Sequence, residues 1–145
     1  MLRLECIAIP YQKNNMATYD QMISSAGASS IGTAYDTAKA VALQYTKFGK
    51  QQINVHASML EVQLSNISSV TKLYATLSRD AAGDNILMTE TRSDIQTGIT
   101  TNTKGCALYR MDVIIRDIQD KTLYLHVRTN TGSCDVDSAS LTYAC

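Results

Sequence analysis

Two runs of alternating residues, 106–115 and 122–128, constrain the fold of this chain more than any other feature. The apolar face of the first run consists of Ala107, Tyr109, Met111, Val113 and Ile115. The apolar face of the second run consists of Leu123, Leu125 and Val127. Apolar residues at every second position are typical of a strand with one buried face. We therefore predict two adjacent antiparallel strands, joined by the polar turn 116–121, on which the other strands pack.

The other apolar runs also have the length and spacing of strands. They lie at 2–9, at 53–64 with a change of phase near Met59 and Leu60, at 71–78, at 86–88, and at 134–143 with a second change of phase after Val136. A β-bulge at the first phase change would keep both halves of that strand pointing inward. Polar segments with turn residues separate the runs. About seven strands in this pattern predict a mainly β fold, an antiparallel β-sandwich of the jelly-roll type.

The N-terminal third has a different character. Residues 10–32 are small and polar with no sustained period, and we expect this arm to lie across its own domain or around a neighbouring subunit. Residues 33–48 are rich in alanine and follow a candidate N-cap, Thr33, so they predict one helix. The whole chain, residues 1–145, is then a single domain in which residues 10–50 form an arm-plus-helix excursion.

The charge and hydropathy of the chain disfavour several classes of partner. Thirteen Lys and Arg balance thirteen Asp and Glu, so no net field attracts nucleic acid or an anionic membrane. The apolar runs are far shorter than the ~20 residues that span a bilayer, and the first ten residues do not resemble a secretory signal. We expect a soluble protein with neither a nucleic-acid partner nor a membrane partner.

Four cysteines are widely separated in the sequence: Cys6, Cys106, Cys134 and Cys145. No C-x-x-C pair is present, which argues against a zinc site or a thioredoxin-like site. Free thiols in a reducing compartment are the expectation. A bridge between Cys134 and Cys145 across a hairpin is left open by the spacing.

No set of residues has the pattern of a catalytic site. The two histidines, His56 and His126, fall at outward positions of predicted strands, and no nucleophile, base and acid follow a triad signature. Asp80, Asp84 and Asn85 share one turn and carry oxygen ligands of the kind that Ca²⁺ prefers, but their spacing is not that of an EF-hand loop. We predict no catalytic residue, no bound metal and no cofactor.

Two surfaces carry side chains suited to a binding partner. Tyr124, His126 and Arg128 form a predicted exposed stripe that offers a ring and a cation to a sugar or a carboxylate. On the polar face of 106–115, the aliphatic residues Leu108 and Ile114 would be covered by a partner or by the helix at 33–48. The predicted interaction surface therefore comprises Leu108, Ile114, Tyr74, Tyr124, His126 and Arg128.

Four segments follow one another in a fixed order within residues 53–143: LYATLSRDAAGD at 73–84, TGITTNTKG at 97–105, TLYLHVRTNTGS at 122–133 and SASLTY at 138–143. Their order resembles that in small β-sandwich structural proteins of tailed bacteriophages and other virions. The resemblance implies a capsid decoration (cement) protein, a minor capsid protein or a spike head, commonly trimeric. It leaves residues 10–50 unexplained and transfers no active-site residue.

Two functions from different classes follow from these observations. The first is a non-enzymatic virion structural protein, made in the host cytoplasm, that contacts the major capsid protein, other virion proteins and copies of itself. The alternative is a carbohydrate-binding or host-receptor-binding module that uses the predicted stripe together with Tyr74. A hydrolase ranks last because no acid, base and nucleophile can be named.

Overall fold

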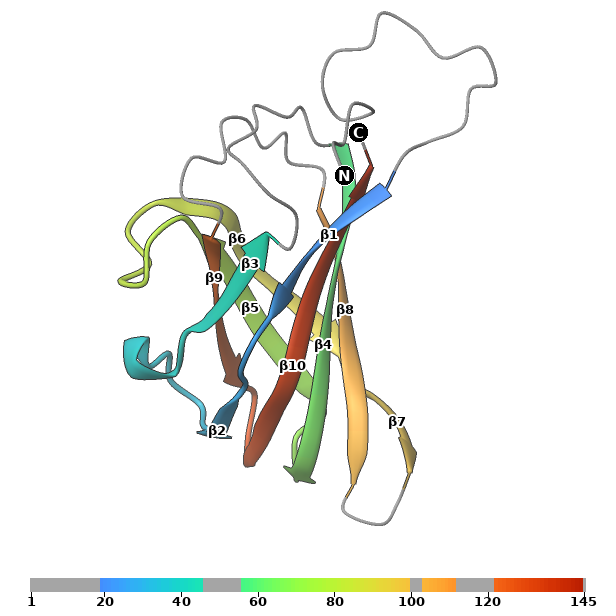
Figure 1. The fold of residues 1–145 in the computed structure, drawn as a ribbon. Helices are drawn as coiled ribbons and strands as arrows, with labels where there is room; N and C mark the ends of the chain where they lie inside the picture. The colour runs from blue at the N-terminus through green and yellow to red at the C-terminus, as the bar shows by residue number, and fades with distance from the viewer. Residues whose placement is uncertain (1–18, 46–55, 100–102, 112–121, 145) are drawn as a thin grey trace, which may run out of the picture.

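The computed structural model describes residues 19–45, 56–99, 103–111 and 122–144, and strands dominate these ranges (Figure 1). The strands are β1 (Tyr19–Ser24), β2 (Ala28–Ile31), β3 (Val41–Tyr45), β4 (His56–Ser68), β5 (Lys72–Ser78), β6 (Ile86–Asp94), β7 (Gln96–Ile99), β8 (Lys104–Met111), β9 (Thr122–Thr129) and β10 (Ser133–Ala144). One 3-10 turn, η2 (Thr37–Lys39), precedes β3. Within the described ranges, no helix is long and apolar enough to cross a membrane.

The strands form two antiparallel layers that face each other (Figure 1). The first layer has the order β1-β10-β4-β8, with β2 paired to β10, and the second has the order β3-β9-β5-β6. Pairing of β1 with β3 joins the layers on one side. On the other side β6 pairs with β5, while β7, one residue further along the chain, pairs with β8. The chain thus crosses between the layers at Ile95, so that β6 and β7, which lie at the two ends of the strand order, are consecutive along the chain.

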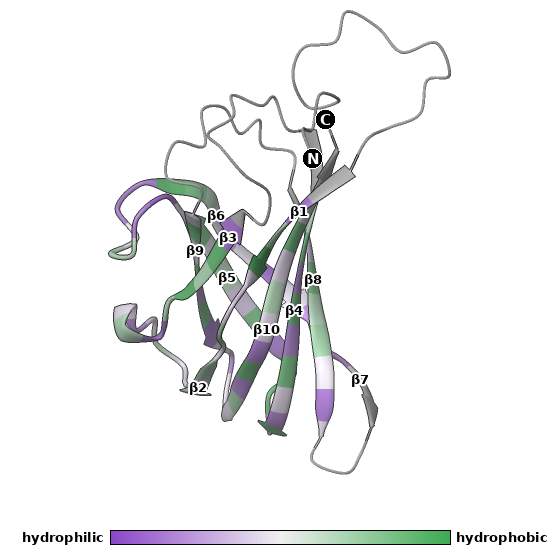
Figure 2. Cartoon of the chain, in the orientation of Figure 1, coloured by the Kyte–Doolittle hydropathy of each residue, from purple (hydrophilic) through white to green (hydrophobic). Residues whose placement is uncertain are grey.

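Rows of apolar side chains, set by strand register, fill the space between the layers. In the first layer Met22, Leu141, Leu60 and Tyr109 lie side by side on four strands, and each is at most 2% exposed. In the second layer the corresponding row is Val41, Leu125, Leu77 and Met88. Figure 2 shows the alternation of hydrophobic and hydrophilic residues along β4 and β10. The mainly β sandwich predicted from the sequence is confirmed.

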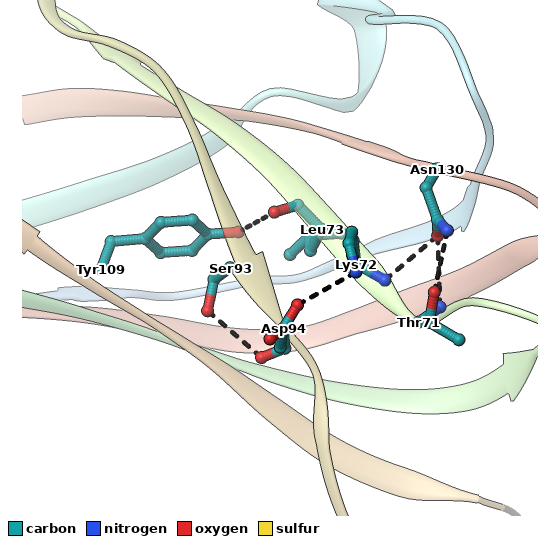
Figure 3. Close-up of polar contacts among 7 residues, drawn as sticks. All are labelled: Thr71, Lys72, Leu73, Ser93, Asp94, Tyr109 and Asn130. Atoms are coloured by element: carbon teal, nitrogen blue, oxygen red, sulfur yellow. Dashed lines mark hydrogen bonds and ion pairs between the residues drawn. The ribbon is translucent and has the colours of Figure 1, made fainter.

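Tyr109 makes a direct polar link between the layers (Figure 3). Its hydroxyl, carried by β8, donates a buried hydrogen bond of 2.6 Å to the backbone oxygen of Leu73 on β5. Burial raises the pKa of this phenol far above its usual range, so the hydroxyl stays protonated as a donor. Nearby, the Asn130 side chain bonds the backbone amides of Thr71 and Lys72, which fixes the end of β9 to the start of β5.

The prediction of a helix over residues 33–48 was wrong. Asp36, not Thr33, caps the single turn η2, and its carboxylate accepts from the amide of Ala38. Residues Val41–Tyr45 form β3, which lies between β1 and β9 and joins the layers. Val41 and Leu43 are buried, so this segment has the strand period that its alanine content conceals. Tertiary pairing overrides the weak helix propensity of such a short segment.

Of the two placements expected for residues 10–32, the described part takes the one within its own domain, where it forms strands. Residues 19–24 form β1 between β3 and β10, and residues 28–31 form β2 on the edge of β10. Their backbone hydrogen bonds therefore belong to this domain's own sheet. Residues 10–18 and 46–50 of the predicted excursion, like the predicted strand at 2–9, lie outside the described residues.

A further prediction about strand arrangement was wrong. β8 and β9 are not neighbours, because β8 pairs with β4 and β7 whereas β9 pairs with β3 and β5 in the other layer. The bulge expected near Met59 and Leu60 has a counterpart just before Met59, where the register of β4 with β10 shifts between His56 and Met59, while the register with β8 stays continuous. Leu60 is therefore buried while Met59 points outward and is 37% exposed.

Other local predictions are confirmed. The register of β10 with β4 shifts between Val136 and Ser138, as the change of phase after Val136 predicted. Leu73, Ala75 and Leu77 are fully buried, as their spacing indicated. Gly132 has a φ of 69° in the turn before β10, a left-handed conformation that glycine adopts without strain.

The Tyr109 hydrogen bond gives a direct test of how the layers are held together. Tyr109→Phe should lower the free energy of unfolding by about 1–3 kcal/mol, because it removes a buried hydrogen bond and leaves the Leu73 carbonyl without that donor. Tyr124→Phe is the matched control, since Tyr124 is half-buried on the outer face of β9. Urea denaturation measures both. Equal effects of the two substitutions would contradict the role assigned to Tyr109.

Candidate functional site

The predicted stripe lies on the outer face of the second layer, where register brings residues of β5 and β9 together. Tyr74 is directly opposite Arg128, and Ser78 is directly opposite Tyr124. The structure therefore unites Tyr74 and Arg128, as their positions on outward strand faces suggested. It does not leave the whole stripe at the surface, because two segments of the chain fold back over this face.

The first covering segment is held by a cluster of four residues, Tyr35, Tyr74, Glu90 and Arg128, which we name the Arg128 cluster. The guanidinium carbon of Arg128 lies 4.0 Å from the ring centroid of Tyr74 and 5.5 Å from that of Tyr35. Its Nε and Nη2 donate to the two carboxylate oxygens of Glu90, at 3.0 and 3.1 Å. The Tyr35 hydroxyl donates to the same carboxylate at 2.6 Å. The cluster thus fastens the chain around Tyr35 onto β5, β6 and β9.

Within the Arg128 cluster, the positive charge of Arg128 and the negative charge of Glu90 neutralise each other. The hydrogen bonds from Arg128, followed by the one from Tyr35, lower the pKa of the Glu90 carboxyl. Burial and then the hydrogen bond to Glu90 raise the pKa of the Tyr35 phenol well above its usual range. At neutral pH Arg128 is therefore a cation engaged with an ionised carboxylate. It is not the unpaired cation that the stripe hypothesis requires.

The second covering segment is the turn between β5 and β6, and it buries His126. The prediction that His126 is exposed was wrong, because this side chain is only 5% exposed. A Cβ added to Gly83, in the turn, would lie 3.5 Å from the His126 Nε2. A strand pattern shows which face a residue occupies, but it does not show that a later turn folds back over that face.

Ser78 and His126 are in contact, but their arrangement does not suit nucleophilic catalysis. The Ser78 Oγ lies 3.0 Å from the His126 Nε2 and donates its proton to the backbone oxygen of Asp80 at 2.7 Å. The imidazole is then the donor toward Ser78 and cannot act as its base. Ser78 is fully buried, so a substrate does not reach the hydroxyl. The pair holds the turn in place.

The carboxylate of Asp80 serves the same turn. It accepts from the backbone amides of Asn85 at 2.8 Å and Asp84 at 3.1 Å, and these bonds lower the pKa of the Asp80 carboxyl. Both Asp80 oxygens considered for Ca²⁺ thus have partners within their own loop. Among the residues that the structure describes, no group of three or more His, Cys, Asp or Glu side chains could hold a metal ion.

A cavity of about 380 Å³ opens beside the Arg128 cluster. It is bounded by residues 30–36, with Lys39 and Val127 completing the wall. The Lys39 ammonium donates to the backbone oxygen of Ser30 at 2.6 Å, and the amide of Ser30 donates to Asp135 at 2.8 Å. Sequence reasoning missed this cavity because it assigned most of the wall to a helix. The Asp36 N-cap pattern was the signal that a turn begins there.

The outer face of the first layer, in contrast, carries partly exposed apolar side chains. Register places Ile23, Ser140, Glu61 and Leu108 in one row, and Gln21, Thr142, Met59 and Arg110 in the next. Ile23, Met59 and Leu108 are 42%, 37% and 38% exposed. We name this surface, formed by the eight residues of the two rows, the open sheet face.

Of the two groups proposed to cover Leu108, a partner and the helix at 33–48, the structure excludes the helix. The helix expected at residues 33–48 does not exist, and the chain at Tyr35 contacts residues of the second layer instead. Leu108 is thus exposed on the open sheet face. Ile114, its predicted companion, lies outside the described residues.

The two described cysteines are free thiols. Cys134 is buried on β10, and burial raises its pKa to about 11. Cys106 is half-buried on β8. The bridge considered between Cys134 and Cys145 is therefore not formed, and Cys6 and Cys145 lie outside the described residues.

Comparisons with known proteins show little. No protein-family model matches the chain, and no curated protein matches it. Among solved structures, it is similar to a carbohydrate-binding module of Cellvibrio mixtus lichenase 5A, solved in complex with cellotriose. The TM-score is 0.41 at 13% sequence identity, and the match covers 83% of this chain and 94% of that chain. A likeness of this degree assigns neither a ligand nor a site residue to this chain.

The Arg128 cluster predicts a pH-dependent contribution to stability. The folded-state pKa of Glu90 is lowered, so its contribution is complete above the ordinary carboxyl value of 4.5 and is lost as pH falls through the folded value. Glu90→Gln should therefore lower the urea midpoint at neutral pH and have a much smaller effect in strong acid.

Asp94→Asn is the matched control for Glu90→Gln. It removes a surface ion pair with Lys72 in which the Asp94 side chain is 81% exposed, and such pairs contribute little. Its urea midpoint should stay close to that of the wild type at neutral pH. An effect of Glu90→Gln that is the same at neutral and strongly acidic pH would contradict the electrostatic account of the cluster.

Proposed function

We propose that this chain is a non-enzymatic structural protein of a virus particle, a capsid decoration (cement) or minor capsid protein that stabilises the particle through protein–protein contacts. Its partners are the major capsid protein or other virion proteins, together with further copies of itself in a homo-oligomer, for which a trimer is favoured. Its place is the virion. The proposal has three supports: the sequence resemblance, the strand topology and the difference between the two outer faces.

The strand topology supports this class of protein. The orders β1-β10-β4-β8 and β3-β9-β5-β6 are those of two interlocked Greek keys, which is the jelly-roll arrangement. Jelly rolls are common in viral capsid proteins and also in lectins. The topology is therefore compatible with particle assembly and with glycan binding, and the surfaces must distinguish them.

The open sheet face is the single observation that carries the proposal. The outer face of the second layer is partly covered by the chain's own Tyr35 and by the turn that buries His126. The open sheet face instead presents Ile23, Met59 and Leu108 among polar side chains. Apolar side chains ringed by polar ones are typical of protein-binding surfaces.

The free energy gained by burying the open sheet face against a partner suits a contact that is repeated many times. Each of the three apolar side chains is already more than half covered, so completing its burial contributes about 1 kcal/mol, roughly half the value for full burial. One such contact is weak by itself. On a particle, symmetry repeats the contact and each linked copy adds to the avidity.

Charge substitutions on the open sheet face test the proposal. The double variant Met59→Glu, Leu108→Glu should weaken co-sedimentation with virus particles at least about tenfold, because it places two charges in an apolar contact. Sedimentation velocity of the free protein should show a matching loss of self-association. Thermal unfolding should change little, since both side chains are partly exposed.

Ile86→Glu provides the matched control. Ile86 is 46% exposed, like the residues of the open sheet face, but it lies on β6 in the second layer. This variant should bind particles as the wild type does. A wild-type protein that stays monomeric and never sediments with particles would contradict the proposed function.

The alternative function of carbohydrate binding through the predicted stripe has less support. His126 is buried and Arg128 is engaged with Glu90, so Tyr124 and Tyr74 are the members of the stripe that keep partly exposed rings. Thr76 and the buried His126 lie between these two half-buried tyrosines, so the two rings do not form one continuous platform for a sugar.

A further inference from the structure

We propose that the cavity beside the Arg128 cluster binds one ring of a neutral sugar, as a glycan-recognition site separate from the open sheet face. This inference goes beyond the adhesive function proposed above and does not depend on it. The size of the cavity suits a ligand of this kind. A cavity of about 380 Å³ lies at the small end of the ~300–1,000 Å³ range of ligand sites.

The walls of the cavity are held in place before any ligand arrives. On one side the Tyr35 hydroxyl is bonded to Glu90. At the base the amide of Thr129, on β9, donates to the backbone oxygen of Gly32 at 2.9 Å. On the other side Lys39 is bonded to Ser30. A pre-formed site costs little ordering on binding, which favours recognition of a small ligand.

The lining combines an apolar part with a polar part. The Tyr35 ring supplies the accessible apolar surface, since Ile31 and Val127 in the wall are only 2% and 4% exposed. Thr33, Asp36 and Lys39 supply hydroxyl, carboxylate and ammonium groups. The N-cap bond to Ala38 uses one Asp36 oxygen, and the bond to Ser30 uses one of three Lys39 donors. Acceptors and donors therefore stay available beside an aromatic ring. A sugar ring has the complementary surface, with apolar C–H groups on its faces and hydroxyls at its edge.

The charges around the cavity favour a neutral ligand. Asp36 and Lys39 have opposite signs and stand on the same wall. Lys39 also acts on Asp135, whose pKa is lowered chiefly by the hydrogen bonds from Asn66 and Ser30 and to a smaller extent by Lys39. Arg128 is balanced by Glu90. Among the described residues, the charges around the cavity leave no net positive field to select a phosphate, a sulfate or an acidic sugar.

A glycan array and NMR titration test the proposal together. The full chain is applied to an array of neutral and acidic glycans, and the best neutral hit is then titrated as its methyl glycoside into ¹⁵N-labelled protein. Amide shifts should concentrate at residues 30–36, Lys39 and Val127. Absence of any neutral hit, selective binding of acidic glycans, or shifts centred on Tyr124 would overturn the proposal.

Substitutions in the wall sharpen the test. Asp36→Asn and Tyr35→Ala should each weaken binding of the methyl glycoside at least about tenfold, because each removes a hydrogen-bonding or stacking partner of the sugar. Tyr124→Ala should leave the affinity within about twofold, since Tyr124 does not line the cavity. Loss of binding in Tyr124→Ala, with binding retained in Asp36→Asn, would assign the sugar to the stripe and overturn the proposal.

Two controls separate this proposal from folding and from particle assembly. Thr33→Val keeps the size of the side chain, removes one hydroxyl from the wall and leaves the Arg128 cluster intact, so it should weaken sugar binding without lowering the unfolding temperature. Asp36→Asn should sediment with particles as the wild type does, because the open sheet face is unchanged. A cavity variant that lost both sugar binding and particle binding would contradict a separate site. The double variant Met59→Glu, Leu108→Glu should lose particle binding alone.

Discussion

Burial of two facing rows of side chains is the interaction on which the rest of this structure depends. Met22, Leu141, Leu60 and Tyr109 from one layer pack toward Val41, Leu125, Leu77 and Met88 from the other. Each row continues over four strands only because register aligns it. The buried hydrogen bond from Tyr109 to Leu73 adds a directional link between the layers. With the inner faces fixed in this way, the outer faces are left to determine what the protein contacts.

The two outer faces differ in how far the chain itself covers them, and the difference comes from the segments that connect the strands. The segment before β3 contains Tyr35, which reaches Glu90 and stacks near Arg128 on the second layer. The turn after β5 covers His126 on the same layer. The first layer keeps Ile23, Met59 and Leu108 partly exposed. The protein thus stabilises one face internally and leaves the other available, which is why we assign adhesion to the open sheet face.

The sequence predicted the local pattern of the strands well and their arrangement poorly. Leu73, Ala75 and Leu77 alternate strictly, and the shift after Val136 was visible as a change of phase. The neighbours of β8 and β9 were not predictable, because pairing between distant strands leaves no signal in a single sequence. Val41 to Tyr45 was assigned to a helix since alanine-rich flanks masked its period of two. Of the candidate site, the outward positions of Tyr74 and Arg128 followed from strand faces, whereas their pairing came only from the structure. The roles of Tyr35 and Glu90 and the burial of His126 depend on how loops return to the sheet.

The most direct test of the central claim is the oxidation rate of Met59 in the free protein and in the assembled particle. Met59 is 37% exposed on the open sheet face, while Met88 is 5% exposed in the core and provides an internal reference. Peptide mass spectrometry after brief peroxide treatment measures both residues. The account predicts that assembly slows oxidation of Met59 severalfold and leaves Met88 slow in both states. Equal oxidation of Met59 in the free and assembled protein would contradict the claim that this face makes the contacts.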